Sequence, residues 1–61
     1  MTEQETKALL AAMIRKIYRD MSDNALHLSD EMEMGRLQGG EDGAAALRMF
    51  AGLLSLTEEL V

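Results

Sequence analysis

Cysteine, proline and tryptophan are absent from this chain of 61 residues, and histidine occurs only once. The absence of cysteine excludes disulfide bonds, and one histidine supplies too few nitrogen and sulfur ligands for a structural zinc site. A chain of this length buries only about 60% of the surface that its unfolded form exposes. Because such small domains usually need a disulfide, a metal or a second chain, we expect oligomerisation or a protein partner to complete this fold.

Long apolar stretches are also absent. No run of 18 apolar residues occurs, and the first ten residues, MTEQETKALL, are mostly polar. A membrane span needs about 20 consecutive apolar residues, and a secretory signal needs a basic start followed by an apolar core. We therefore predict a cytoplasmic protein that does not bind membranes.

Basic residues are few and unevenly distributed. Six Lys and Arg residues stand against eleven Asp and Glu residues, which gives a net charge of −5. Residues 1–20 carry four basic and three acidic side chains, a net charge of +1, whereas residues 21–61 carry two and eight, a net charge of −6. An acidic majority disfavours nonspecific binding to nucleic acid and permits binding to a basic surface on another protein.

The residues that are present favour helices, because alanine, leucine, methionine and glutamate are abundant. Thr2 and Glu5 match the pattern of a capping box, which predicts a helix that begins near Glu3. Apolar residues then recur at helical spacing and no glycine intervenes before Gly35, so we predict one helix from about residue 3 to about residue 37. Its apolar seam consists of Leu10, Ile14, Ile17, Met21, Leu28 and Met32.

A glycine-rich turn, residues 38–43, separates this helix from a second helix predicted over about residues 44–60, with Asp42 as its N-terminal cap. The apolar residues of the second helix cover about 180° of its circumference, against the roughly 100° stripe of an ordinary surface helix. One neighbouring helix covers only a stripe of that kind. The second helix therefore needs two neighbours, and a single hairpin supplies one.

The predicted helices differ in length, which leaves two arrangements open. In an antiparallel hairpin the second helix reaches only to about residue 21, so the start of the first seam is uncovered. Either the first helix stays whole and packs on a second chain, or it breaks near Ser22 and folds back as a three-helix bundle. We predict an all-α protein with one domain, residues 1–61, built as a two-helix antiparallel hairpin that assembles into a dimeric helical bundle. The three-helix bundle is the alternative.

The predicted interface with a partner or a second copy combines the uncovered part of the first seam with the apolar arc of the second helix. It consists of Leu10, Ile14, Ile17, Leu47, Phe50, Leu53, Leu54 and Leu60.

No residues form a catalytic, cofactor-binding or metal-binding motif. His27 has acidic residues at helical contact spacing, at positions 23, 30 and 31, but a tight zinc site would need a second nitrogen or sulfur ligand. We interpret His27 as a solvated side chain on an acidic surface. We predict that the protein is not an enzyme and has no small-molecule substrate.

The densest group of acidic side chains lies within residues 30–42. One interpretation is a surface that imitates nucleic acid and blocks a nucleic-acid-binding enzyme. Solubility and favourable charge at the helix ends explain the same residues more simply.

The opening of the chain contains Met1, Thr2, Gln4, Glu5, Ala8, Leu9 and Ala12. With these residues it resembles the Rop family of plasmid RNA-binding helical hairpins, which implies an RNA-binding regulator as an alternative function. The family's RNA-binding face carries lysine, asparagine, phenylalanine, glutamine and lysine. None of these stands at the matching positions, which hold Glu3, Leu10, Ile14, Tyr18 and Ala25, so RNA binding does not carry over.

A second resemblance rests on the Gly39-Gly40 turn and on residues 52–58, GLLSLTE. These segments are similar to two-helix co-chaperones of type III secretion needles, and the resemblance implies that such a hairpin can shelter a partner's helix. We therefore expect a small acidic protein–protein interaction module, acting as a regulator, inhibitor or co-chaperone. It would bind itself and another protein through an apolar helix face.

Overall fold

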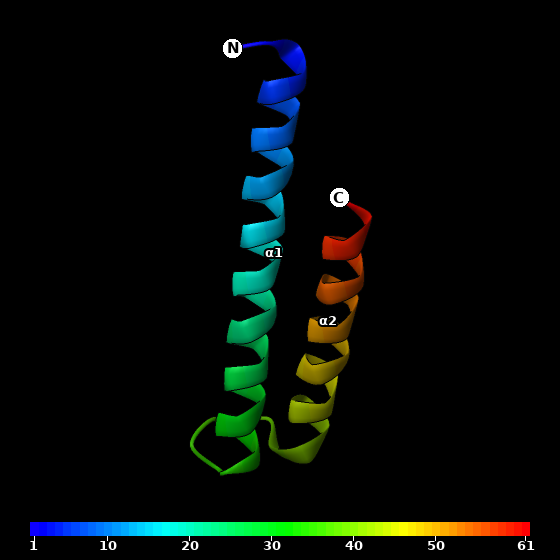
Figure 1. The fold of residues 1–61 in the computed structure, drawn as a ribbon. Helices are drawn as coiled ribbons and strands as arrows, with labels where there is room; N and C mark the ends of the chain where they lie inside the picture. Colours follow the sequence, from blue (N-terminus) through cyan, green and yellow to red (C-terminus); the bar gives the residue numbers. More distant parts are fainter.

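The computed structural model describes all residues 1–61 and contains two helices and no strands. Helix α1 spans Glu3–Glu33 and helix α2 spans Gly40–Leu60, and the two lie antiparallel along one side of each other (Figure 1). The predicted all-α helical hairpin is therefore confirmed. Helix α1 is continuous through Ser22, where the three-helix alternative requires a break.

Helix α1 begins where the capping pattern predicted. The Thr2 hydroxyl accepts a hydrogen bond from the Glu5 backbone N–H at 3.1 Å, which satisfies one of the free amides of the first turn. Lys7 and Glu3 approach to 3.3 Å one turn apart. Local interactions in the sequence therefore fix this end of the helix.

Helix α1 ends at Glu33, four residues before the predicted end. Gly35 adopts a left-handed backbone with φ +79°, and its N–H donates to the Met32 carbonyl at 3.1 Å. The Arg36 N–H donates to the Glu31 carbonyl at 2.9 Å. These two bonds form a Schellman motif, which closes a helix one residue before a left-handed glycine. Gly35 thus stops the helix that the apolar seam alone extended to residue 37.

Helix α2 begins at Gly40, about four residues before the predicted start. Gly39 precedes it with φ +136°, and the Gly43 N–H already donates to the Gly39 carbonyl at 2.8 Å. Asp42 does not cap the helix, because it lies with Glu41 inside the first turn, where its charge favours the positive end of the helix dipole. The turn between the helices is therefore residues 34–39 and not 38–43.

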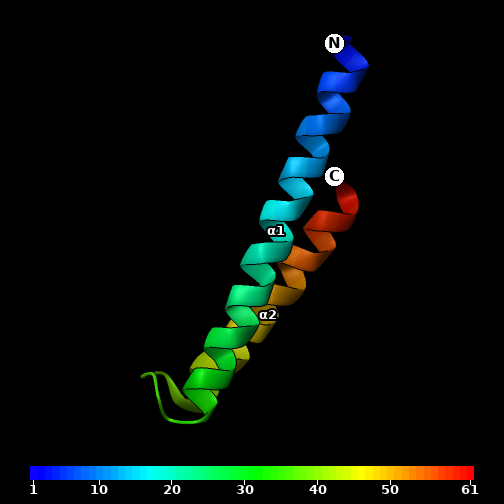
Figure 2. The ribbon, with the colours of Figure 1, turned by 60° about the vertical axis from the view of Figure 1, so that its left-hand side comes forward.

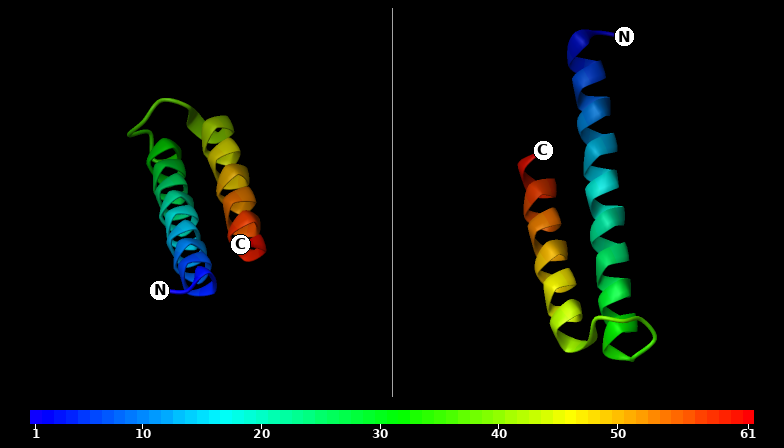
Figure 3. Two further views of the ribbon diagram at one scale, coloured as in Figure 1. Left: turned by 90° about the horizontal axis from the view of Figure 1, so that it is seen from above. Right: turned by 180° about the vertical axis from the view of Figure 1, so that it is seen from behind.

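Because the turn comes about four residues earlier than predicted, α2 extends further along α1. The Arg15 guanidinium donates to the Val61 carbonyl at 2.8 Å, so α2 ends level with residue 15 of α1 and not with residue 21. The N-terminal part of α1 projects beyond the C-terminus, as all views of the ribbon show (Figures 1, 2 and 3). The molecule is a rod of 50 × 17 × 10 Å.

Small side chains make the contact between the helices. Ser22, Ala25 and Ser29 of α1 are buried. They lie at spacings of three and four, which places them on one line of the helix. The buried residues of α2 are Ala44, Ala51 and Leu54. The predicted seam of larger residues is not this line, because Met21 and Leu28 remain 42% and 41% exposed. Small residues allow the helix axes to approach closely, so the larger ones beside them are left outside.

A buried hydroxyl fixes how the two helices are aligned. The Ser22 Oγ donates to the Ala51 carbonyl at 3.2 Å and lies 3.3 Å from the Ser55 Oγ. A shift of one helix along the other would leave this buried hydroxyl without a partner, at a cost of about 1–3 kcal/mol. Ser22 therefore secures the register of the hairpin.

Candidate protein-binding face

The apolar seam of α1 lies to one side of the line that contacts α2. At 100° per residue, Leu10, Ile17 and Leu28 lie about 90–115° from the direction of the buried line. Ile14 and Met21 lie on the same side at about 50–75°. All five side chains are exposed, by between 41% and 55%. The hairpin thus covers one stripe of α1 and leaves its larger apolar stripe open.

Helix α2 repeats this arrangement. Phe50 lies about 80° and Leu53 about 150° from the buried line of α2, in the same rotational sense as the seam of α1. Because both helices are right-handed and run antiparallel, the same rotational sense on each leads to the same side of the hairpin. We define the apolar face as Leu10, Ile14, Ile17, Met21, Leu28, Phe50 and Leu53.

The opposite side of the hairpin carries the ion pairs that join the two helices. The Arg19 guanidinium donates to Glu58 through two nitrogens, at 3.0 and 2.7 Å. Both terminal nitrogens of Arg48 donate to the carboxylate of Glu33, and one lies 3.6 Å from Asp30. The hairpin as a whole is therefore amphipathic, with one side where ion pairs join the helices and an opposite side that is apolar and exposed.

The Arg48 pair changes the proton affinity of both partners. Hydrogen bonding from Arg48, and then its positive charge, lower the pKa of Glu33 below the ordinary value of 4.5. The same hydrogen bond and charge raise the pKa of Arg48. Glu33 is therefore held as a carboxylate, which is the form that ties the end of α1 to α2.

The structure places the predicted interface residues in three groups. Five belong to the apolar face: Leu10, Ile14, Ile17, Phe50 and Leu53. Leu60 is 86% exposed and lies nearer the outer edge of α2. Leu47 is half-buried and Leu54 is buried, so both contribute to the interior of the hairpin. We therefore leave Leu47 and Leu54 out of the face that a partner could contact.

The exposed surface is large for a protein of this size. The chain exposes 4767 Å², whereas a folded monomer of 6.7 kDa exposes about 3,900 Å². The excess is about 850 Å², which is close to the roughly 800 Å² that each partner contributes to a standard protein interface. A radius of gyration of 15.0 Å, against about 10.5 Å for a compact chain of this length, gives the geometric reason.

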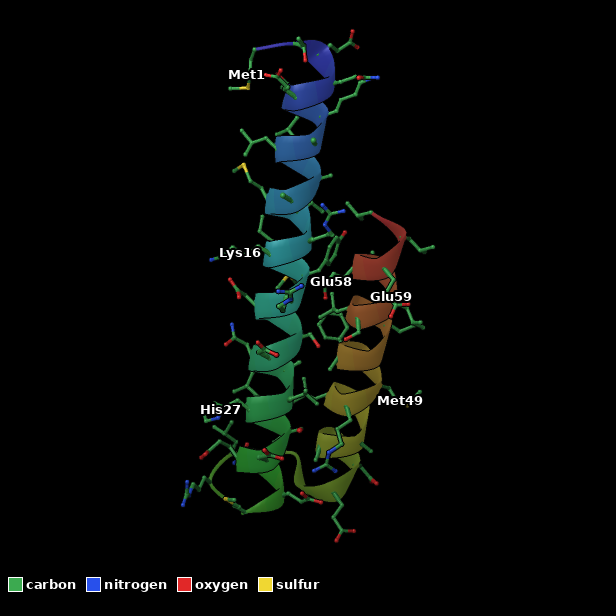
Figure 4. All side chains as sticks on the ribbon, in the orientation of Figure 1. Met1, Lys16, His27, Met49, Glu58 and Glu59 are labelled. Atoms are coloured by element: carbon green, nitrogen blue, oxygen red, sulfur yellow. The ribbon has the colours of Figure 1, made fainter.

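His27, the candidate metal ligand in the sequence, is a surface residue. Figure 4 shows His27 and Lys16 pointing away from α2, and Met49 pointing away from α1. The structure contains no pocket and no group of three or more possible metal-ligating side chains. Neither helix carries an apolar stretch long enough to cross a membrane.

Sequence reasoning missed the small residues that join the helices. The signal was present, because Ser22, Ala25 and Ser29 recur at helical spacing and Ala44 and Ala51 lie seven residues apart. The prediction relied on the large apolar residues and therefore placed the contact with α2 on the wrong stripe of α1. The large residues mark the surface that the hairpin leaves open.

The chain was compared with models of known protein families, with curated protein sequences and with solved structures, and none of them matches it.

Proposed function

We propose that this protein is a small acidic protein–protein interaction module that binds an apolar helix of another protein on its apolar face. In the cytoplasm it would act as a regulator, inhibitor or co-chaperone. The observation that supports this function is the extension of the apolar face over both helices, opposite the side on which ion pairs join the two helices. Two parallel rows of exposed apolar side chains form the kind of surface onto which an amphipathic helix packs.

Phe50 is the candidate anchor of this surface. It is the only phenylalanine, it is 46% exposed, and the binding energy of protein interfaces is concentrated in a few large, often aromatic, side chains. The Ser22–Ala51 hydrogen bond sets Phe50 level with the part of α1 between Met21 and Leu28. Met21 and Leu28 belong to the same face and would exclude water from the same contact. The partner helix would accordingly present an apolar stripe at spacings of three and four residues.

Two leucines of α1 provide a matched test. Leu28 lies on the apolar face and Leu26 on the charged side, about 160° away, and they are 41% and 44% exposed. Leu28→Glu should abolish the recovery of partner proteins from a lysate of the native host, whereas Leu26→Glu should retain it. Helicity is measured by circular dichroism for both variants, so that loss of binding is separated from loss of fold. Equal recovery with both variants would show that the face does not bind the partner.

The alternative functions involve nucleic acid. A Rop-like regulator would bind RNA, and an acidic mimic would compete with nucleic acid for an enzyme. In the structure Asp30 and Glu33 share Arg48, and Glu31 contacts Arg36 at 3.2 Å, so two arginines offset part of the negative charge of the acidic group. Titration with RNA at two salt concentrations tests the first alternative, and salt-dependent binding would favour it over the proposed function.

A further inference from the structure

The area, shape and charge of the hairpin favour one particular occupant of the apolar face. We propose that a second copy of this chain packs on the apolar face in an antiparallel, two-fold arrangement, with the turn of each hairpin beside the N-terminus of the other. This inference rests on the proposed function, because it names the partner that fills the same face in the free protein. Three observations support it: the excess surface, the projecting end of α1 and the distribution of charge.

The excess surface fits one second copy. A symmetric dimer buries the same patch on each chain, and a standard interface takes about 800 Å² from each partner. The hairpin exposes about 850 Å² more than a folded monomer of its mass. If a second copy covers this excess surface, the area that each chain exposes falls to the value expected for its mass.

The projecting end of α1 selects the antiparallel orientation. Leu10, Met13 and Ile14 lie beyond the C-terminus of α2 and are 52%, 53% and 41% exposed. In a parallel dimer these residues meet only the projecting end of the other chain. In an antiparallel dimer centred near Tyr18, the middle of α1, they lie beside residues 22–26 of the other hairpin, where both of its helices run side by side. The antiparallel arrangement therefore covers the part of α1 that α2 does not reach.

Charge favours the same orientation. The turn end of the hairpin, residues 29–48, carries two basic and five acidic side chains, a net charge of −3. A parallel dimer sets two such ends against each other. An antiparallel dimer places each of them beside residues 1–7 of the other chain, which carry one basic and two acidic side chains, a net charge of −1, so the repulsion is lower.

Spin labels on single introduced cysteines measure the orientation directly, because the chain has no cysteine of its own. The labelled variants are Gln4→Cys, near the projecting end, and Gln38→Cys, in the turn; both positions are exposed. With a rise of 1.5 Å per residue, two labels at position 4 lie about 42 Å apart along an antiparallel dimer centred near Tyr18. In a parallel dimer they lie side by side, within about 25 Å.

In an equimolar mixture of the two variants, the antiparallel dimer should give the short label-to-label distance and the parallel dimer the long one. The mixture therefore serves as the internal control. In an antiparallel dimer the label at position 4 of one chain lies beside the label at position 38 of the other, so pulsed dipolar spectroscopy should show a new distance below about 25 Å. A short distance for Gln4→Cys alone, with no short distance in the mixture, would overturn the antiparallel arrangement. Sedimentation equilibrium of each labelled variant, compared with the unlabelled protein, shows that labelling leaves the oligomeric state unchanged.

The outcome for the dimer is separate from the outcome for the proposed function. If the chain sediments as a monomer and shows no dipolar coupling between labels, this inference is wrong, whereas the lysate experiment with Leu28→Glu and Leu26→Glu still decides the proposed function. If the dimer is antiparallel, Leu28→Glu should weaken self-association at least about tenfold, and Leu26→Glu should leave it unchanged. Equal self-association of these two variants would place the dimer contact elsewhere and overturn the inference.

Discussion

Phe50 offers the sharpest test of whether the apolar face is covered in solution. Truncation of a fully buried phenylalanine to alanine costs about 3–5 kcal/mol. In the single hairpin Phe50 is 46% exposed, so about half of that loss, roughly 1.5–2.5 kcal/mol, is expected if the chain acts alone. If a second chain covers the face, the loss should approach the full value for each chain.

Urea denaturation of the wild type and of Phe50→Ala, repeated over a hundredfold range of protein concentration, distinguishes the two cases. The free energy of unfolding of a dimer rises with protein concentration, and that of a monomer does not. Met49→Ala is the matched control, because Met49 is 72% exposed and points away from α1 (Figure 4). Its substitution should change stability by less than about 0.5 kcal/mol.

If a second chain covers the apolar face, two results should occur together. The wild type should gain stability with concentration, and Phe50→Ala should lose more than about 3 kcal/mol per chain. A loss of about 2.5 kcal/mol or less that does not depend on concentration would refute the covered face, because it is the loss expected when Phe50 stays half-exposed in a single hairpin.

Two further predictions concern the end of α1 and the turn. The pKa of Glu33 is lowered in the folded protein by Arg48, so the pair should stabilise the fold above the ordinary value of 4.5 and lose this effect as pH falls through the lower folded value. Urea denaturation from pH 7 to pH 3 should show a shallower loss for Glu33→Gln than for the wild type, and equal slopes would contradict the pair. Gly39→Ala should destabilise the hairpin by more than about 1 kcal/mol, since φ is +136° and an added Cβ would lie 2.8 Å from the Met32 sulfur. Gly52→Ala, in open space within α2, should instead stabilise it by about 0.5–1 kcal/mol, and thermal melting that ranks the two variants the other way would contradict this structure of the turn.

Much of the fold could be predicted from the sequence. The capping pattern of Thr2 and Glu5 and the lack of breakers placed the start of α1 correctly. The glycine-rich segment located the turn approximately. The helix ends near it were wrong by about four residues, because Gly35 closes α1 through backbone bonds to carbonyls that no side-chain pattern reveals.

The candidate site was predictable in composition and less so in position. The excess of large apolar residues over what one hairpin can bury pointed to an uncovered face, and the structure leaves Ile17, Phe50 and Leu53 exposed. Which stripe of each helix meets the other depends on how closely the axes approach. The small residues Ser22 and Ala51 allow this close approach, and a search for large hydrophobic residues does not find them.

The mass of the protein in solution tests the central claim most directly. Sedimentation equilibrium at micromolar concentration, on protein shown by circular dichroism to be fully helical, should give twice the 6.7 kDa of one chain or a higher multiple. Leu28→Glu should shift this mass toward the monomer, and Leu26→Glu should leave it unchanged. A fully helical monomer of 6.7 kDa across the same range would contradict the account, because the apolar face would then remain open to water without a second chain.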